Sequence, residues 1–179
     1  MRRSKAALVA TVGICAGVLE CGKLALAALP NIEVVTLLTA VFGYVFGWAG
    51  IGSALVFVMI EPMIWGFGPW VVSYCIYWPL VALVYMFFGK IKLENRYILT
   101  GTAVLLTVFF GLLTSFVDLL FFSQSVEGFL VRFGAYYARG VLFYLLQTGC
   151  NTVLFFTVFN LLAKKIAAIS PIKQRMDNE

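Results

Sequence analysis

Long apolar runs alternate along this chain with short polar or proline-containing breaks. The first run extends from Ala6 to Leu29 and stops at Pro30, which cannot donate a helical hydrogen bond and which favours extended backbone in the residue before it. Because about 20 apolar residues cross a bilayer as a helix, this run predicts a first membrane span. The later clear runs predict spans over residues 70–88, 98–122 and 140–163.

The run from Val34 to Ile60 is ambiguous. It is consistent with one long helix, or with two short helices of about 13 residues, which are short for a bilayer unless they tilt or line a protein cavity. The two short helices would meet near Gly43, Gly47, Gly50 and Gly52.

Positive charge distinguishes the two interpretations, because cytoplasmic loops of membrane proteins carry an excess of Lys and Arg. Five spans place five of the 13 basic residues on the cytoplasmic side, or seven if the topology is reversed. Six spans with an inner N-terminus place ten there: Arg2, Arg3, Lys5, Lys90, Lys92, Arg96, Lys164, Lys165, Lys173 and Arg175. We therefore predict one all-α integral membrane domain over residues 1–179, with six transmembrane helices, both termini cytoplasmic and a tail from about residue 164.

This topology places three irregular stretches on the outer side of the membrane. They are the break at residues 30–33, the break at residues 61–70 and a longer loop at residues 123–139. Acidic and aromatic side chains gather in or near them, so the sequence predicts a polar, aromatic-lined mouth on that side.

Composition supports a membrane protein and excludes several kinds of site. The chain is 63% hydrophobic and 12% charged, whereas soluble domains carry about 25% charged residues. It has no histidine, and its four cysteines form no CxxC pair, so we expect no metal site and no histidine base. There is no nucleotide-binding glycine loop and we expect no cofactor. The net charge of +5 indicates no nucleic-acid partner, because the basic residues flank spans.

Candidate ligand-binding residues come from the outer half of the predicted topology. We predict a site formed by Lys23, Asn31, Glu33, Glu61, Trp65, Phe67, Trp70, Tyr74, Tyr144, Gln147 and Asn151. The aromatic members would stack against a flat ligand, and the polar members would orient it by hydrogen bonds.

Structural roles remain open for the same residues. Lys23 lies three residues after Glu20 and could pair with it on one helix face. The aromatic residues are also typical of an interfacial belt, and Trp70, Tyr74 and Tyr77 share a helix face. The amides of the last span could simply bridge helices.

Small residues form a smooth stripe along the inner half of the first span. Ala6, Ala10, Gly13 and Gly17 are spaced four, three and four apart. Small side chains let another helix approach closely, so the stripe would pack against the protein's own helices or dock a separate subunit.

The size of the chain, its six predicted spans, the Ala6–Ala10 pair and the polar outer mouth resemble the substrate-binding S components of energy-coupling factor transporters. The segments Leu29-Pro30-Asn31-Ile32-Glu33-Val34-Val35-Thr36 and Glu61-Pro62-Met63-Ile64-Trp65-Gly66-Phe67-Gly68 are similar to that family as well.

The resemblance implies a non-enzymatic subunit in a prokaryotic plasma membrane. Such proteins bind a vitamin or vitamin precursor from outside and associate with a membrane coupling subunit and two ATPase subunits, which hydrolyse the ATP. In this family the small face around Ala6 and Ala10 contacts the coupling subunit. The many aromatic residues suggest a ring-containing ligand of the cobalamin type or another heterocyclic vitamin.

Two other classes remain open. A secondary transporter or channel subunit would favour an internal repeat, and the spans show none. A membrane enzyme would need carboxylate or cysteine chemistry, because the chain has no histidine.

The topology makes a first testable prediction. Asn95→Cys and Gln124→Cys, each in a chain without native cysteines, should react with an impermeant thiol reagent from opposite sides of the membrane. The reason is the charge asymmetry, which places residues 89–97 inside. Reaction of Asn95→Cys in intact cells would contradict the six-span topology.

Overall fold

The structure is a computed structural model, and it describes residues 5–29, 32–122 and 128–169. Within these ranges, helices are the only regular secondary structure. They are α1 (Lys5–Ala25), α2 (Val35–Phe46), α3 (Trp48–Trp65), α4 (Trp70–Lys90), α5 (Arg96–Phe122), α6 (Phe129–Leu154), the π-helical segment η1 (Phe155–Phe159) and α7 (Asn160–Ile169). In this described part, five helices are long and apolar enough to cross a membrane, with α6, η1 and α7 counted as one, and α2 is shorter but apolar. The chain is therefore built as a multi-pass helical membrane protein.

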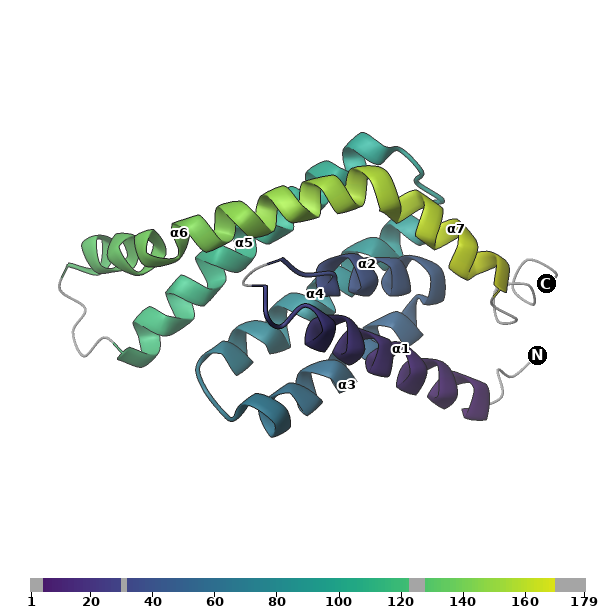
Figure 1. Cartoon of the computed structure of the whole chain (residues 1–179), viewed down its shortest axis with the longest axis horizontal. Coiled ribbons are helices and arrows are strands. Elements are labelled where there is room, and N and C mark those ends of the chain that lie inside the picture. The colour runs from purple at the N-terminus through teal and green to yellow at the C-terminus, as the bar shows by residue number, and fades with distance from the viewer. Residues whose placement is uncertain (1–4, 30–31, 123–127, 170–179) are drawn as a thin grey trace.

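The helices form a bundle from which one long hairpin extends. Figure 1 shows α1 to α4 grouped together, while α5 and α6 run side by side beyond them. The start of α1 and the end of α7 lie at one end of the bundle, because Ala7 and Ile169 line the same cavity. Asn160 of α7 donates a hydrogen bond to the Glu94 carbonyl oxygen over 3.0 Å, which places the α4–α5 connection at that end too.

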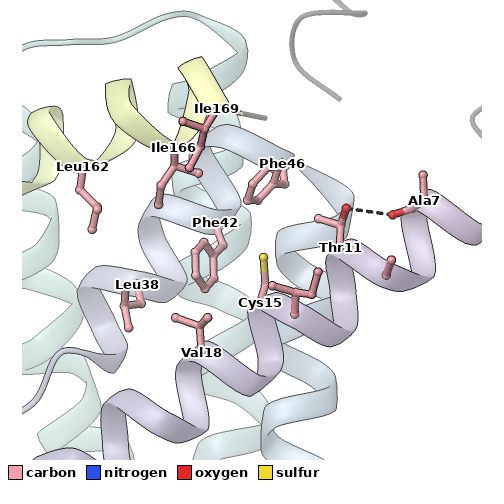
Figure 2. A pocket seen from close by; sticks show the side chains of 12 residues that line it. Ala7, Thr11, Cys15, Val18, Leu38, Phe42, Phe46, Leu162, Ile166 and Ile169 are labelled. Carbon is pink, nitrogen blue, oxygen red and sulfur yellow. Dashed lines mark hydrogen bonds between the residues drawn. The ribbon is translucent and has the colours of Figure 1, made fainter. Parts of the chain in front are cut away.

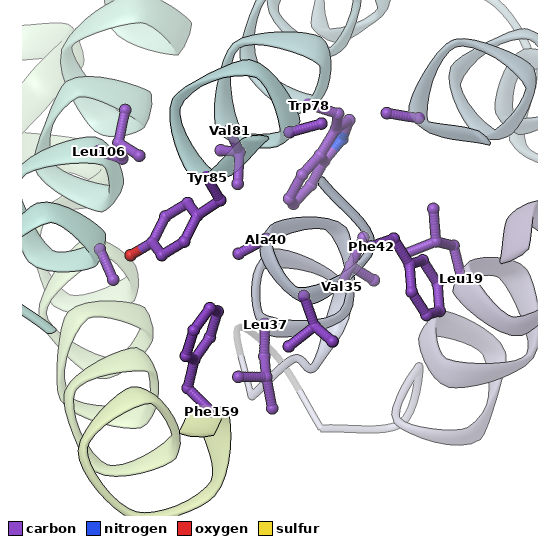
Figure 3. Close-up of a cluster of buried hydrophobic side chains, with 14 of the residues drawn as sticks. Leu19, Val35, Leu37, Ala40, Phe42, Trp78, Val81, Tyr85, Leu106 and Phe159 are labelled. Carbon is purple, nitrogen blue, oxygen red and sulfur yellow. The ribbon is translucent and has the colours of Figure 1, made fainter. Parts of the chain in front are cut away.

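The core lies where α2 and α4 pack between the other helices. Figure 3 shows Leu19 of α1 against Phe42 of α2, and Tyr85 of α4 beside Phe159 of η1. The Tyr85 hydroxyl is buried, yet it donates a hydrogen bond of 2.6 Å to the Leu99 carbonyl oxygen. This bond lets a polar group sit in an apolar core without losing its hydrogen bond.

Two glycines have separate roles here: Gly47 forms the break in the second apolar run, and Gly43 allows α2 to approach α4 closely. Gly47 has a φ of 61° between α2 and α3, a conformation that side chains other than glycine rarely adopt. The interpretation of residues 34–60 as two helices is confirmed, with α3 longer than expected at 18 residues. Gly43 lies against α4, where an added Cβ atom would be 2.2 Å from the Ala82 carbonyl oxygen.

The break expected at Glu61 is wrong. Helix α3 continues through Glu61 and Pro62 to Trp65, and the chain reverses at residues 66–69 instead. Pro62 lies in the last turn, where its carbonyl oxygen accepts the amide of Gly66 over 3.0 Å. Neighbouring helices bury both Glu61 and Pro62, and such packing tolerates proline in membrane helices.

Three other expected boundaries are also wrong. Helix α1 ends at Ala25 rather than at Leu29. Helix α6 starts at Phe129, so most of the loop expected at residues 123–139 is helical. The helix expected to end near Ala163 continues in α7 to Ile169, and the cytoplasmic tail from about residue 164 stays a prediction. Charge misled the sequence reading, since Arg132 and Arg139 lie on the exposed surface of a helix and do not interrupt it.

The close approach of α2 and α4 makes a second prediction. We expect Gly43→Ala to lower the free energy of unfolding by about 1–3 kcal/mol, because the new methyl group would overlap the backbone of α4. Gly101→Ala on exposed α5 is the matched control, since its added methyl group would meet no described atom within 4 Å. Thermal unfolding in detergent measures both, and equal stability of the two variants would refute the packing argument.

Candidate functional site

An ion pair joins α1 to α3 near the end of the bundle opposite the described termini. Lys23, in the last turn of α1, pairs with Glu61, whose side chain is 0% exposed. Four rings surround the ammonium, with their centroids 5.0 to 6.0 Å from Nζ: Phe57, Trp65, Trp70 and Tyr74. A carboxylate and aromatic faces both stabilise a partly buried cation, so this arrangement holds Lys23 in one place.

The pairing differs from the one expected within α1. Glu20 is 8% exposed, and its carboxylate oxygens have no hydrogen-bond partner among the described residues. Lys23 reaches across to α3 instead, because the buried Glu61 offers a carboxylate inside the aromatic ring cluster.

A second polar cluster joins the α1–α2 connection to α6. The Glu33 carboxylate accepts hydrogen bonds from the Thr36 amide and hydroxyl over 2.8 and 2.5 Å, at the start of α2. From α6, Asn151 donates to it over 3.2 Å and Gln147 over 3.5 Å. Asn151 also donates to the Thr107 hydroxyl of α5 over 3.0 Å, so one carboxylate links three parts of the chain.

A cavity of about 200 Å³, which we call the polar cavity, lies between these two clusters. Its walls come from the end of α1, the α1–α2 connection, α2, α4, α5 and α6. The lining residues are Lys23, Leu26, Ala27, Leu29, Ile32, Glu33, Val35, Tyr74, Trp78, Phe110 and Gln147. A concave site with mostly apolar walls and a few polar groups is the usual form of a small-molecule site.

The structure brings most of the sequence candidates together. Lys23, Glu33, Tyr74 and Gln147 line the polar cavity. Glu61, Trp65 and Trp70 surround the Lys23 ammonium, and Asn151 binds Glu33 from behind the wall.

Three candidates are not placed there. Phe67 is 85% exposed and does not line the cavity. Tyr144 packs between α5 and α6, where its hydroxyl lies 3.1 Å from that of Thr114. Asn31 lies outside the described residues.

Sequence reasoning missed several residues of the site. Phe110 carries no signal, because it sits in a continuous apolar run of α5. Trp78 lies four residues after Tyr74, one helical turn along α4, and its ring is 5.6 Å from that of Tyr74, so the aromatic pattern indicates it. Thr107 hydrogen-bonds Asn151. The sequence could have indicated it, because it is a polar residue within an apolar span.

A larger cavity of about 630 Å³, which we call the apolar groove, lies toward the end of the bundle that holds the described termini. Figure 2 shows side chains of α1, α2 and α7 around it, among them Cys15, Phe42 and Ile166. The hydroxyl of Thr11 donates to the Ala7 carbonyl oxygen over 2.9 Å within its own helix. The groove therefore offers shape and apolar area rather than polar recognition.

The small-residue stripe of α1 borders this groove and is open. Ala6, Ala10, Gly13 and Gly17 are all exposed, and Ala10 lines the groove itself. A methyl group added at either glycine would meet no atom within 4 Å in the described part of the chain. Of its two interpretations, packing against the protein's own described helices is therefore wrong, and docking of a separate subunit stays a prediction.

Two further results bear on function. No group of three or more metal-ligating side chains occurs among residues 5–29, 32–122 and 128–169. Comparisons with protein-family models, with curated proteins and with solved structures found no match to this chain. Function therefore has to be argued from the two cavities.

The ion pair makes a third prediction. Lys23→Met should destabilise the protein by about 3 kcal/mol, because it leaves the buried Glu61 carboxylate without its partner. Lys23→Met combined with Glu61→Gln should cost less than the two single changes added together. The control is Lys164→Met, which removes an exposed pair with Glu94 and should change stability little. Additive effects in this double-mutant cycle would show that the Lys23–Glu61 pair contributes no coupling.

Proposed function

We propose that this chain is the substrate-binding S component of an energy-coupling factor transporter. It captures a vitamin or vitamin precursor from outside a prokaryotic cell for ATP-driven uptake. A membrane coupling subunit and two ATPase subunits supply the energy, so the chain itself is not an enzyme. In this proposal six helices cross the plasma membrane and both termini are cytoplasmic.

The observation that carries the proposal is the separation of two unlike cavities. The polar cavity lies away from the described termini and has charged, amide and aromatic walls. The apolar groove lies near them, beside an open stripe of small residues. One end is thus equipped to bind a small molecule and the other to receive a helix of another subunit.

The polar cavity also favours one of the two expected ligand types. At about 200 Å³ it is smaller than the roughly 300–1,000 Å³ that is common for drug-sized ligands. It suits a single heterocycle as its walls stand, whereas a corrin would require them to separate. Mass spectrometry of ligand retained by the purified protein identifies the compound directly.

The stripe makes a fourth prediction, which tests the proposed function. Ala6→Leu with Ala10→Leu should abolish uptake and co-purification of ATPase subunits while ligand binding stays intact. The reason is steric, since leucine would hold the partner helix away from α1. The polar cavity is unaffected, because neither alanine lines it.

The matched control is Ala135→Leu with Ala138→Leu, which adds the same volume at exposed positions of α6. This control should transport normally. Normal uptake by the Ala6→Leu, Ala10→Leu variant at wild-type expression would rule out docking at the stripe, and failure of any ATPase subunit to co-purify with the parent would refute the transporter assignment.

A further inference from the structure

The charges around the polar cavity do not balance. Among the described residues that line it, Lys23 carries the one positive charge and Glu33 the one negative charge. The Lys23 ammonium is already paired with Glu61, a fully buried carboxylate of α3. Glu20, one turn before Lys23 on α1, brings a further carboxyl group and no positive charge. Glu33 therefore leaves a negative charge in the cavity wall that no cation of its own compensates.

The hydrogen bonds to the Glu33 carboxylate come from neutral donors and leave room for another. Its Oε1 accepts the Thr36 hydroxyl, the Asn151 amide and the Gln147 amide, over 2.5, 3.2 and 3.5 Å. Its Oε2 accepts only the Thr36 backbone amide among the described residues, over 2.8 Å. A carboxylate has about four acceptor positions on its two oxygens, so Oε2 can take one more donor. A charge away from water is costly without an opposite partner, so a cationic donor is what this carboxylate lacks.

Aromatic rings in the same wall also favour a cation. Tyr74, Trp78 and Phe110 line the cavity, and the Tyr74 ring lies 5.6 Å from that of Trp78 and 6.1 Å from that of Phe110. The faces of aromatic rings carry partial negative charge and attract cations. The protein already holds one ammonium in this way, because Lys23 Nζ is 5.0 Å from the centroid of the Tyr74 ring.

The rest of the wall limits the body of a ligand. It is mostly aliphatic and comes from the end of α1, the connection that follows it and the start of α2: Leu26, Ala27, Leu29, Ile32 and Val35. These side chains form no hydrogen bonds, so the part of a ligand that lies beside them has to be apolar. The volume of about 200 Å³ leaves space for roughly one ring or a short branched chain.

From these observations we infer that the polar cavity binds a small organic cation, a protonated amine on an apolar body of about one ring. This inference rests on the substrate-binding role proposed for the cavity. The N–H of the ligand donates to the Glu33 carboxylate, and the positive charge lies among the aromatic rings of the wall. The apolar body packs against the aliphatic side chains. An anion would meet the uncompensated Glu33 carboxylate instead.

Three probes of similar size test the inference. Benzylamine, benzyl alcohol and benzoate share one ring and are cationic, neutral and anionic near neutral pH. We expect benzylamine to bind the purified full chain in lipid nanodiscs about tenfold more tightly than benzyl alcohol, because a charge-assisted hydrogen bond is stronger than a neutral one, and benzoate to bind most weakly. Saturation-transfer NMR titrations give the affinities, with empty nanodiscs as the blank for partition into lipid. Equal or tighter binding of benzyl alcohol or benzoate, or no saturable binding of benzylamine above the blank, would overturn the inference.

Variants at Glu33 test its role in charge selection. Glu33→Gln removes the charge at nearly the same shape, so benzylamine and benzyl alcohol should then bind about equally. Glu33→Asp keeps the charge on a shorter side chain and should keep the preference for benzylamine, even if both affinities fall because the contacts of Glu33 with α2 and α6 are disturbed. The preference is a ratio measured on one protein, so general loosening of the site affects it little.

The matched control is Glu94→Gln, the same chemical change at an exposed carboxylate in the α4–α5 connection. This control should bind the three probes as the parent does. A preference for benzylamine that survives in Glu33→Gln, or that is lost equally in Glu33→Asp, would show that the Glu33 charge does not select the ligand. If Glu33→Gln does not fold, the probe series on the parent and on Glu33→Asp still decides the inference.

The result is separable from the test of the proposed function. Preference for benzyl alcohol or benzoate together with co-purifying ATPase subunits would overturn the ligand class and leave the transporter role standing. Preference for benzylamine without such subunits would support the ligand chemistry and count against the transporter role.

Discussion

The arrangement of the helices depends on the Glu33 carboxylate. It lies just before α2, binds the first turn of that helix, and receives the amides of α6. The Glu33 carbonyl oxygen also accepts the Cys150 thiol over 3.7 Å. The α5–α6 hairpin otherwise meets the remaining helices mainly through apolar contacts. Such contacts are non-directional, so they hold helices at a given distance but do not fix how far one helix is shifted along the other. A charge-assisted hydrogen bond is directional, so Glu33 sets how the hairpin sits against α2.

The same constraint shapes the polar cavity. Glu33 can hold α6 only by taking the N–H groups of its amides, which turns the Gln147 carbonyl oxygen away from it. On the other side, Lys23 and Glu61 neutralise each other within the ring cluster. Among the described residues, the Glu33 carboxylate receives hydrogen bonds only from neutral groups, so it keeps a negative charge in the wall of the polar cavity.

The helices and the residue types of the site could be predicted from the sequence, but the partners could not. The lengths of the apolar runs predicted the bounds of α4 and α5 to within two residues, because the thickness of the bilayer sets the length of a membrane helix. The proline rule wrongly predicted that the helix breaks at Glu61 and Pro62, because burial by neighbouring helices stabilises the last turn of α3. Spacing suggested that Lys23 pairs with Glu20, whereas Glu61 lies 38 residues away. Such long-range pairing depends on how helices pack, which spacing along one helix does not contain.

The two cavities are separate in space but share two helices. Leu26 and Ile32, from the connection between α1 and α2, line the polar cavity, while Ile14 and Phe42, from the helices so joined, line the apolar groove. The contact of Gly43 with the backbone of α4 leaves no room for α2 to slide past its neighbour without separating from it. Two ligands affect each other only through states that differ in their contacts with both. Helix α1 lines both cavities, and so does the continuous helix of α6, η1 and α7, through Gln147 at the polar cavity and Ile166 at the apolar groove.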